Sequence, residues 1–160
     1  MGPAGSGKST LGAALAQQLQ LPFVEGDTLH SARSLQKMQR GEPLDDADRD
    51  PWLAAVAAQL ADAERTPRGL IITCSALKQA YRQRLRESTP GLRFIFLDVP
   101  QEVAERRVAE RASHFLPARL VPTQFATLER PTPQEHDVMT VQAGGPAAAT
   151  LAAVLRALAP

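Results

Sequence analysis

The stretch that decides the fold lies at the start of the chain, where residues 2–10 are GPAGSGKST. The pattern G-x-x-x-x-G-K-[ST] is typical of a phosphate-binding loop, which normally follows a buried strand and opens a helix. Apolar residues at helical spacing follow the loop as far as Leu19, and Pro22 closes the segment, so we expect a helix over residues 9–20. A match that opens a good helix favours a genuine nucleotide site over a chance match.

Each part of this loop has a chemical task. Its glycines let backbone N–H groups turn toward a β-phosphate, and the start of the helix adds a partial positive charge. Lys8 would reach the β- and γ-phosphates, and Ser9 would ligate Mg²⁺. We therefore expect ATP and Mg²⁺ as cofactors, held by Gly2, Pro3, Ala4, Gly5, Ser6, Gly7, Lys8, Ser9 and Thr10.

Length, composition and charge limit the class of protein to which the chain can belong. The chain has 160 residues, of which 44% are hydrophobic, so we expect one compact domain over residues 1–160. A formal net charge of +1 provides no basic field for nucleic acid, and no apolar run is long enough to span a bilayer. The single cysteine cannot form an internal disulfide and no secretory segment is evident, so we expect a cytoplasmic protein.

Beyond the loop, short apolar strands alternate with helices. We expect strands within residues 22–27, 69–74, 92–99 and 136–143. We expect further helices within residues 31–41, 43–65, 77–88, 101–113, 119–128 and 146–159. No hairpin signal joins any two strands, which predicts an α/β fold with a parallel sheet covered by helices on both faces. The phosphate loop would lie at the carboxyl end of this sheet, where ligands bind.

Phosphoryl transfer also needs a carboxylate for the metal or for the acceptor hydroxyl. Asp98 ends the strand within residues 92–99, but an aspartate there is commonly a turn residue. Glu25 and Asp27 flank a glycine at a sheet edge that also faces the loop, and we favour this pair, although both could be helix caps.

The choice of basic residues is a further clue. Arginine supplies 15 of the 18 basic residues, and the only lysines are Lys8, Lys37 and Lys78. A compact ammonium can approach crowded phosphates or hydroxyls where a planar guanidinium cannot. The scarcity of lysine therefore favours a functional role for these three positions.

Three long stretches carry a family resemblance. EGDTLHSARSLQKMQRGEPLDDADRDPWL, CSALKQAYRQRLR and HFLPARLVPTQFATLERP resemble the gluconate kinases, in the same order and over nearly the whole chain. The resemblance implies a fold related to nucleoside monophosphate and shikimate kinases, with a mobile lid at about residues 112–130. It also implies transfer of the γ-phosphoryl group of ATP to the 6-hydroxyl of D-gluconate with Mg²⁺.

The resemblance implies roles for individual residues. Asp27 would accept the proton of the 6-hydroxyl or hold that hydroxyl in line, and His30 would hydrogen-bond a sugar hydroxyl. Lys37 lies in the first of the three stretches and Lys78 in the second, and the resemblance implies that both stretches contact the substrate. Arg82, one turn after Lys78, suits bidentate pairing with the gluconate carboxylate.

Arg111 would swing with the lid onto the phosphates during transfer, and His114 and Phe115 would shape the lid. The remaining residues of interest are expected to have no direct role in the reaction. Arg86, Arg106 and Arg107 would lie in solvent, Trp52 would lie in the core, and Cys74 would lie at a strand end.

The chain departs from the family pattern at a few positions. Ser31 and Ser34 stand where the family usually has proline and asparagine, and Glu25 stands where aspartate is frequent. The acceptor could therefore be a different sugar acid. Two other functions stay open, namely another small-molecule kinase acting on shikimate or a nucleotide, and a catalytically weak ATP-binding module. A homodimer would be usual for the family.

The start of the chain raises one more expectation. In the related kinases the sheet order is 2-3-1-4-5, so a first strand before the loop would be central, between the strands expected within residues 69–74 and 92–99. Without it both neighbours would expose unpaired backbone groups, each costing about 1–3 kcal/mol against a total stability of about 5–15 kcal/mol. We therefore expect that Met1 is not the true start and that a short Val- or Ile-rich strand precedes it.

Overall fold

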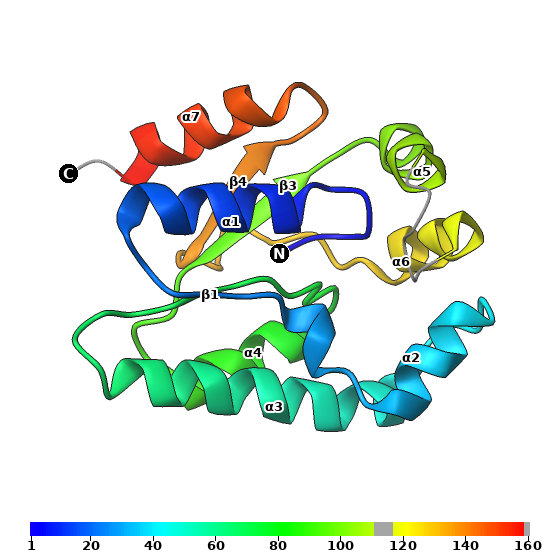
Figure 1. Ribbon diagram of the computed structural model, residues 1–160, viewed down its shortest axis with the longest axis horizontal. Helices are drawn as coiled ribbons and strands as arrows, with labels where there is room; N and C mark the ends of the chain where they lie inside the picture. The colour runs from blue at the N-terminus through cyan, green and yellow to red at the C-terminus, as the bar shows by residue number, and fades with distance from the viewer. Residues whose placement is uncertain (111–116, 159–160) are drawn as a thin grey trace.

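The computed structural model describes residues 1–110 and 117–158, and helices alternate in it with short strands (Figure 1). The helices are α1 (Lys8–Leu19), α2 (Ala32–Gln39), α3 (Asp46–Glu64), α4 (Gln79–Ser88), α5 (Gln101–Ala109), α6 (Val121–Thr127) and α7 (Ala147–Leu158). Two 3₁₀ turns are η1 (Gly26–Leu29) and η2 (Ala118–Leu120), and the strands are β1 (Phe23–Val24), β2 (Ile71–Ile72), β3 (Phe94–Asp98) and β4 (Val138–Gln142).

The strands pair in parallel, which confirms the expected α/β class. β1 pairs with β2, and β3 pairs with β4 along its whole length, from Phe94 opposite Val138 to Asp98 opposite Gln142. Helices α1 and α7 lie on one side of the strands, and α3 and α4 lie on the other (Figure 1). β1 and β2 are shorter than the sequence predicts, since each spans two residues.

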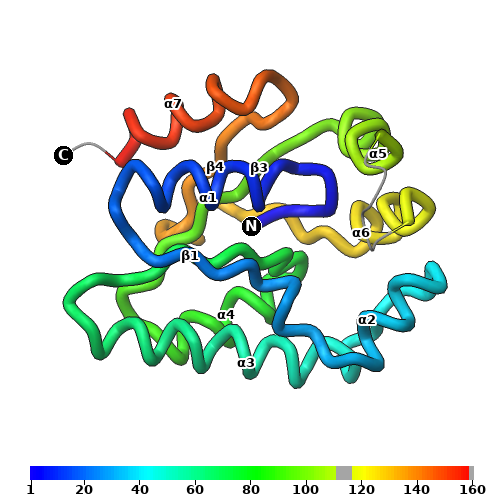
Figure 2. The backbone as a smooth tube through the Cα atoms, in the orientation of Figure 1, coloured from blue at the N-terminus to red at the C-terminus, as the bar shows by residue number. Residues whose placement is uncertain are grey.

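The first residues of the chain run between the two strand pairs, and the N-terminus lies near the middle of the molecule (Figure 2). The amide of Leu97 donates to the carbonyl of Met1 at 3.0 Å, and the amide of Gly2 donates to the carbonyl of Ser75 at 3.2 Å. A cavity of about 140 Å³ lies here, lined mainly by apolar side chains that include Ile72 and Phe94. The expected central strand before residue 1 stays a prediction.

The longest helix, α3, begins with a capping box. The Asp45 carboxylate accepts a hydrogen bond from the amide of Asp48 at 2.8 Å, and the Asp48 carboxylate accepts one from the amide of Asp45 at 3.2 Å. Further along the helix, Trp52 is 1% exposed in a core cluster that also holds Leu85 of α4. The expectation that Trp52 is a core residue is confirmed, and the start of α3 is held in a defined position.

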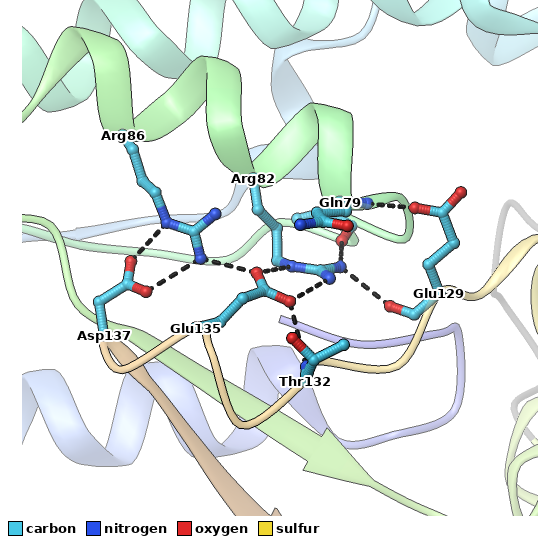
Figure 3. A network of polar contacts seen from close by, with 8 residues as sticks. Gln79, Arg82, Arg86, Glu129, Thr132, Glu135 and Asp137 are labelled. Atoms are coloured by element: carbon cyan, nitrogen blue, oxygen red, sulfur yellow. Dashed lines mark hydrogen bonds and ion pairs between the residues drawn. The ribbon is translucent and has the colours of Figure 1, made fainter.

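A buried ionic network fastens α4 to the segment that returns from α6 to β4 (Figure 3). Arg82 donates from two nitrogens to the two carboxylate oxygens of Glu135, each at 2.7 Å, and also to the carbonyls of Ala76 and Glu129. Arg86 donates to Glu135 and Asp137, both at 2.7 Å at the closest. The expectation that Arg86 is a solvated charge is therefore wrong, because its side chain is 20% exposed and paired with two carboxylates.

Glu135 is expected to be the residue on which this network depends. The Glu135→Gln variant leaves two arginines facing an uncharged amide, and breaking a buried ion pair in this way costs about 3–5 kcal/mol of unfolding free energy. The measurement is urea unfolding at pH 7. The matched control is Asp62→Asn, which breaks an exposed pair with Arg65 and should change stability by less than about 1 kcal/mol. Equal stability of the two variants would contradict this role.

The same residue predicts a dependence of stability on pH. The hydrogen bond from Arg82 lowers the pKa of Glu135 from 4.5 to about 2; burial opposes this shift, and Arg86 adds to it. The stability that this carboxylate contributes is fully present above pH 4.5, and it is lost as the pH falls toward 2. In the Glu135→Gln variant this part of the acid destabilisation should be missing.

None of the helices in residues 1–110 and 117–158 combines the length and the apolar character needed to cross a membrane.

Candidate active site

The loop at residues 2–7 has the backbone conformation that phosphate binding requires. Gly5 has φ 78° and Gly7 has φ 94°, both in the left-handed region that favours glycine. A Cβ added to Gly5 would lie 2.3 Å from the carbonyl oxygen of Ala104, so no larger residue fits there. Helix α1 begins at Lys8 directly after the loop, and its free N–H groups and dipole favour an anion at this position.

The side chains around the loop fit a nucleotide. Lys8 donates from Nζ to the carbonyl of Pro3 at 3.0 Å, which holds its ammonium over the loop. Ser6 is 2% exposed, and its hydroxyl is buried without a hydrogen-bond partner among the described residues. Ser9 and Thr10 are exposed in the first turn of α1, where their hydroxyls are accessible to a ligand.

Arg107 of α5 joins the loop to the segment between β4 and α7. Its guanidinium donates to the carbonyls of Ala143 and Gly145, both at 2.8 Å, and more weakly to Gly5 at 3.4 Å. The expectation that Arg107 remains in solvent is therefore wrong, because backbone carbonyls from two distant segments converge on it. A cavity of about 250 Å³ beside these contacts is lined by Ser6, Thr10, Arg107, Pro146 and other residues of the same segments.

Of the three candidate carboxylates, only that of Asp27 has no partner among the described residues. Glu25 accepts a hydrogen bond from the hydroxyl of Thr73, which also accepts one from the amide of Gly26 at 3.0 Å. Asp98 pairs with Arg130 at 2.6 Å and accepts a hydrogen bond from Gln142. Glu25 and Asp98 are thus occupied by other side chains, whereas Asp27 is available to a ligand.

Asp27 and Lys8 lie near the same buried thiol. Burial raises the pKa of Cys74 to about 11; the charge of Asp27 acts in the same direction, and the charges of the N-terminus and of Lys8 oppose it. Cys74 is 6% exposed and lies two residues after β2, which agrees with a small strand-end residue. The charges of Lys8 and Asp27 thus both act on the segment that follows β2.

His30 follows η1 and stacks on Trp52, with ring centroids 4.6 Å apart. It is 9% exposed, and its Nδ1 has no hydrogen-bond partner among the described residues. Burial lowers the pKa of His30 to about 4, the charge of Asp27 opposes this shift, and the charge of Arg49 supports it. At neutral pH His30 is therefore an uncharged imidazole that can exchange a hydrogen bond with a hydroxyl group.

The two serines that depart from the family pattern have a structural role. The Ser31 hydroxyl caps α2 by accepting a hydrogen bond from the amide of Ser34 at 3.1 Å, and the Ser34 hydroxyl lies 3.0 Å from it. A serine is a good N-cap, so this pair can begin the helix without the proline.

Lys37 and Lys78 both pair with the first turn of α3. Lys37 forms an ion pair with Asp48, and Lys78 donates to the two oxygens of Asp46 at 2.7 and 2.8 Å. Lys78 also lies over the ring of Tyr81, with 5.5 Å between Nζ and the ring centroid. The expected contact of Lys37 and Lys78 with substrate stays a prediction. In the structure the two lysines pair with Asp48 and Asp46.

The geometry does not support a sugar-binding role for Arg82. Its side chain is 1% exposed, and Glu135 and two backbone carbonyls already occupy its guanidinium. We therefore assign Arg82 to the network that holds α4. The expected roles of Arg111, His114 and Phe115, and residues 112–116 of the expected lid, lie outside the described residues. The rest of the expected lid holds η2 and α6.

Sequence reasoning missed two residues of the site. Gln124 of α6 accepts a hydrogen bond from the amide of Ala4 at 2.7 Å, which ties α6 to the phosphate loop. Arg49 is buried at the start of α3 with its charge unpaired among the described residues. Arg49 stands among four aspartates in the sequence. A basic residue there suggests a surface ion pair, so no local signal marks it.

A glycine-rich loop that opens a helix at the carboxyl end of parallel strands, with a lysine over it and a free carboxylate nearby, defines a P-loop kinase. A family model described as "AAA domain" matches residues 1–131. The chain belongs to the gluconokinase family of P-loop kinases.

Two sequence relatives illustrate this membership. The thermoresistant gluconokinase of Escherichia coli (strain K12) is 41% identical over 99% of this chain and 90% of its own length. The gluconokinase of Gluconobacter oxydans (strain 621H) is 42% identical over 84% of this chain and 76% of its own length.

Solved structures agree with this grouping. A crystal structure of a gluconokinase from Sinorhizobium meliloti 1021 is 43% identical with a TM-score of 0.87, covering 98% of this chain and 87% of the other. Shikimate kinase from Aquifex aeolicus has a TM-score of 0.64 at 19% identity, with 99% and 92% of the two chains covered, and this similarity concerns the fold alone.

Proposed function

We propose that this protein transfers the γ-phosphoryl group of ATP to the 6-hydroxyl of D-gluconate, giving 6-phospho-D-gluconate and ADP. The main support for gluconate as the acceptor is the 41% identity to a gluconokinase over 99% of the chain. The phosphate loop and the free carboxylate of Asp27 supply the two groups that such a transfer needs, so the site supports the same reaction.

The loop would bind the phosphates through its backbone amides and Lys8, and the cavity of about 250 Å³ beside Arg107 would take the nucleoside. The Ser9 hydroxyl would hold Mg²⁺, which when bound neutralises charge on the phosphate oxygens. Asp27 would orient the 6-hydroxyl and accept its proton as the oxygen bonds to phosphorus. His30 would fix the acceptor by a hydrogen bond to another hydroxyl.

We further expect Arg111 and a lid at residues 112–130 to close over the phosphates and exclude water during transfer. The reaction would take place in the cytoplasm, where ATP is available. A homodimer is the expected assembly.

The test is a panel of acceptors with coupled detection of ADP. D-gluconate should stimulate ADP formation far above the rate with ATP alone, while shikimate and nucleoside monophosphates should not. Stimulation by shikimate or a nucleotide instead would assign the protein to another acceptor class. ATP hydrolysis that no acceptor stimulates would favour the ATP-binding module.

A further inference from the structure

Arg49 is a buried cation without a partner in the part of the chain that the structure describes. It lies in the first turn of α3 and is 9% exposed. No described residue accepts a hydrogen bond from its guanidinium or forms an ion pair with it, whereas Arg82, the other buried arginine, has a carboxylate and two carbonyls. A buried charge is strongly unfavourable unless it is paired, so the position of Arg49 calls for an anion.

The carboxylates beside Arg49 in the sequence are already engaged elsewhere. Asp50, the next residue, pairs with Arg84 at 2.5 Å. Asp45 caps α3 through the amide of Asp48. Asp46 accepts hydrogen bonds from Lys78 and Tyr81, and Asp48 pairs with Lys37. Two of the three lysines in the chain thus pair with Asp46 and Asp48, and none of these four aspartates forms an ion pair with Arg49.

Arg49 also lines two hollows that share Leu44, Arg49 and Thr127. The larger has a volume of about 440 Å³, which suits a small molecule, and its wall also holds Asp45, Asp46, Lys78 and Tyr81. Since Lys78 and Tyr81 donate to Asp46, Arg49 is the cation of this wall that no carboxylate of the described residues pairs with.

The smaller hollow, of about 30 Å³, is lined in part by Gln124. Because Gln124 accepts a hydrogen bond from the loop amide of Ala4, this smaller hollow adjoins the phosphate loop. Arg49 is also close enough to His30 for its charge to act on that imidazole. Arg49 therefore lines both hollows, one of which adjoins the phosphate loop, and its charge reaches the neutral histidine.

We propose that Arg49 binds the carboxylate of the acceptor and selects sugar acids over neutral sugars. The inference rests on the proposed function, since it takes a sugar acid as the acceptor. A guanidinium can hold a carboxylate by two parallel hydrogen bonds, which fixes the orientation of an acyclic substrate as well as its charge. Lys37 and Lys78 are then positioning residues that keep the neighbouring aspartates away from this contact.

The test is steady-state kinetics of Arg49→Met and Arg49→Lys. Arg49→Met should raise KM for D-gluconate about 10- to 100-fold, while KM for ATP stays within about twofold. Arg49→Lys should retain part of the affinity for D-gluconate, because it keeps the positive charge and loses the pair of parallel hydrogen bonds. Arg68→Met, an exposed arginine beyond the far end of α3, is the matched control and should leave all constants unchanged.

D-glucitol, which has a hydroxymethyl group in place of the carboxylate, separates charge recognition from a structural role. The wild-type protein should bind gluconate far more tightly than glucitol, measured as KM or as an inhibition constant, and Arg49→Met should lose this preference. An unchanged preference, or an equal loss for both compounds, would overturn the assignment, as would a rise in KM for ATP alone. If the wild-type protein phosphorylates no sugar acid, the proposed function itself fails.

Discussion

The Lys8→Ala variant is expected to lose phosphoryl transfer almost completely. In the structure the ammonium lies over the loop, with Nζ 3.0 Å from the carbonyl of Pro3, where it can follow the charge that moves from ATP to the acceptor. Removing one preorganised electrostatic contact of this kind costs about 10²–10³ in kcat, or about 3–4 kcal/mol. The measurement is kcat with saturating gluconate and ATP.

The control for this variant is Gln18→Ala, an exposed position on the same helix, which should leave turnover unchanged. Thermal unfolding of both variants should match the wild-type protein, so that lost activity cannot be ascribed to lost structure. Full turnover by Lys8→Ala would rule out this loop as the active site.

The Asp27→Asn variant is expected to lower kcat by about 10²–10⁴ and to leave KM for ATP within about twofold. The substitution preserves the size of the side chain and removes only the ability to accept a proton from the 6-hydroxyl. Because no other described residue pairs with the Asp27 carboxylate, no structural contact is lost with the charge.

Glu25→Gln is the informative comparison for Asp27. Glu25 accepts a hydrogen bond from Thr73, so its change should affect stability more than kcat. An unchanged kcat in Asp27→Asn would transfer the role of base to Glu25 or to Asp98. These variants therefore assign the three carboxylates to separate roles.

The phosphate loop and the order of elements could be predicted from the sequence because both depend on local rules. A glycine pattern that requires left-handed φ values, and apolar residues at a period of 3.6 or 2, act within a few residues of one another. The expected helix over residues 9–20 accordingly agrees within one residue at each end with α1. β1 and β2 were less predictable, since strand length depends on which neighbours pair with the backbone.

The identity of the phosphate loop, the α/β class and the likeness to gluconokinases follow from the sequence alone, because each is a pattern of residue types along the chain. The roles of the arginines do not. The sequence predicted that Arg82 binds the substrate, but Arg82 pairs with Glu135. It predicted that Arg107 is a surface charge, but Arg107 donates to backbone carbonyls. Arg49 carried no signal, yet it is buried without a partner among the described residues. A long cation can reach several anions, and which one it meets is decided by segments tens of residues away that only the tertiary structure brings together.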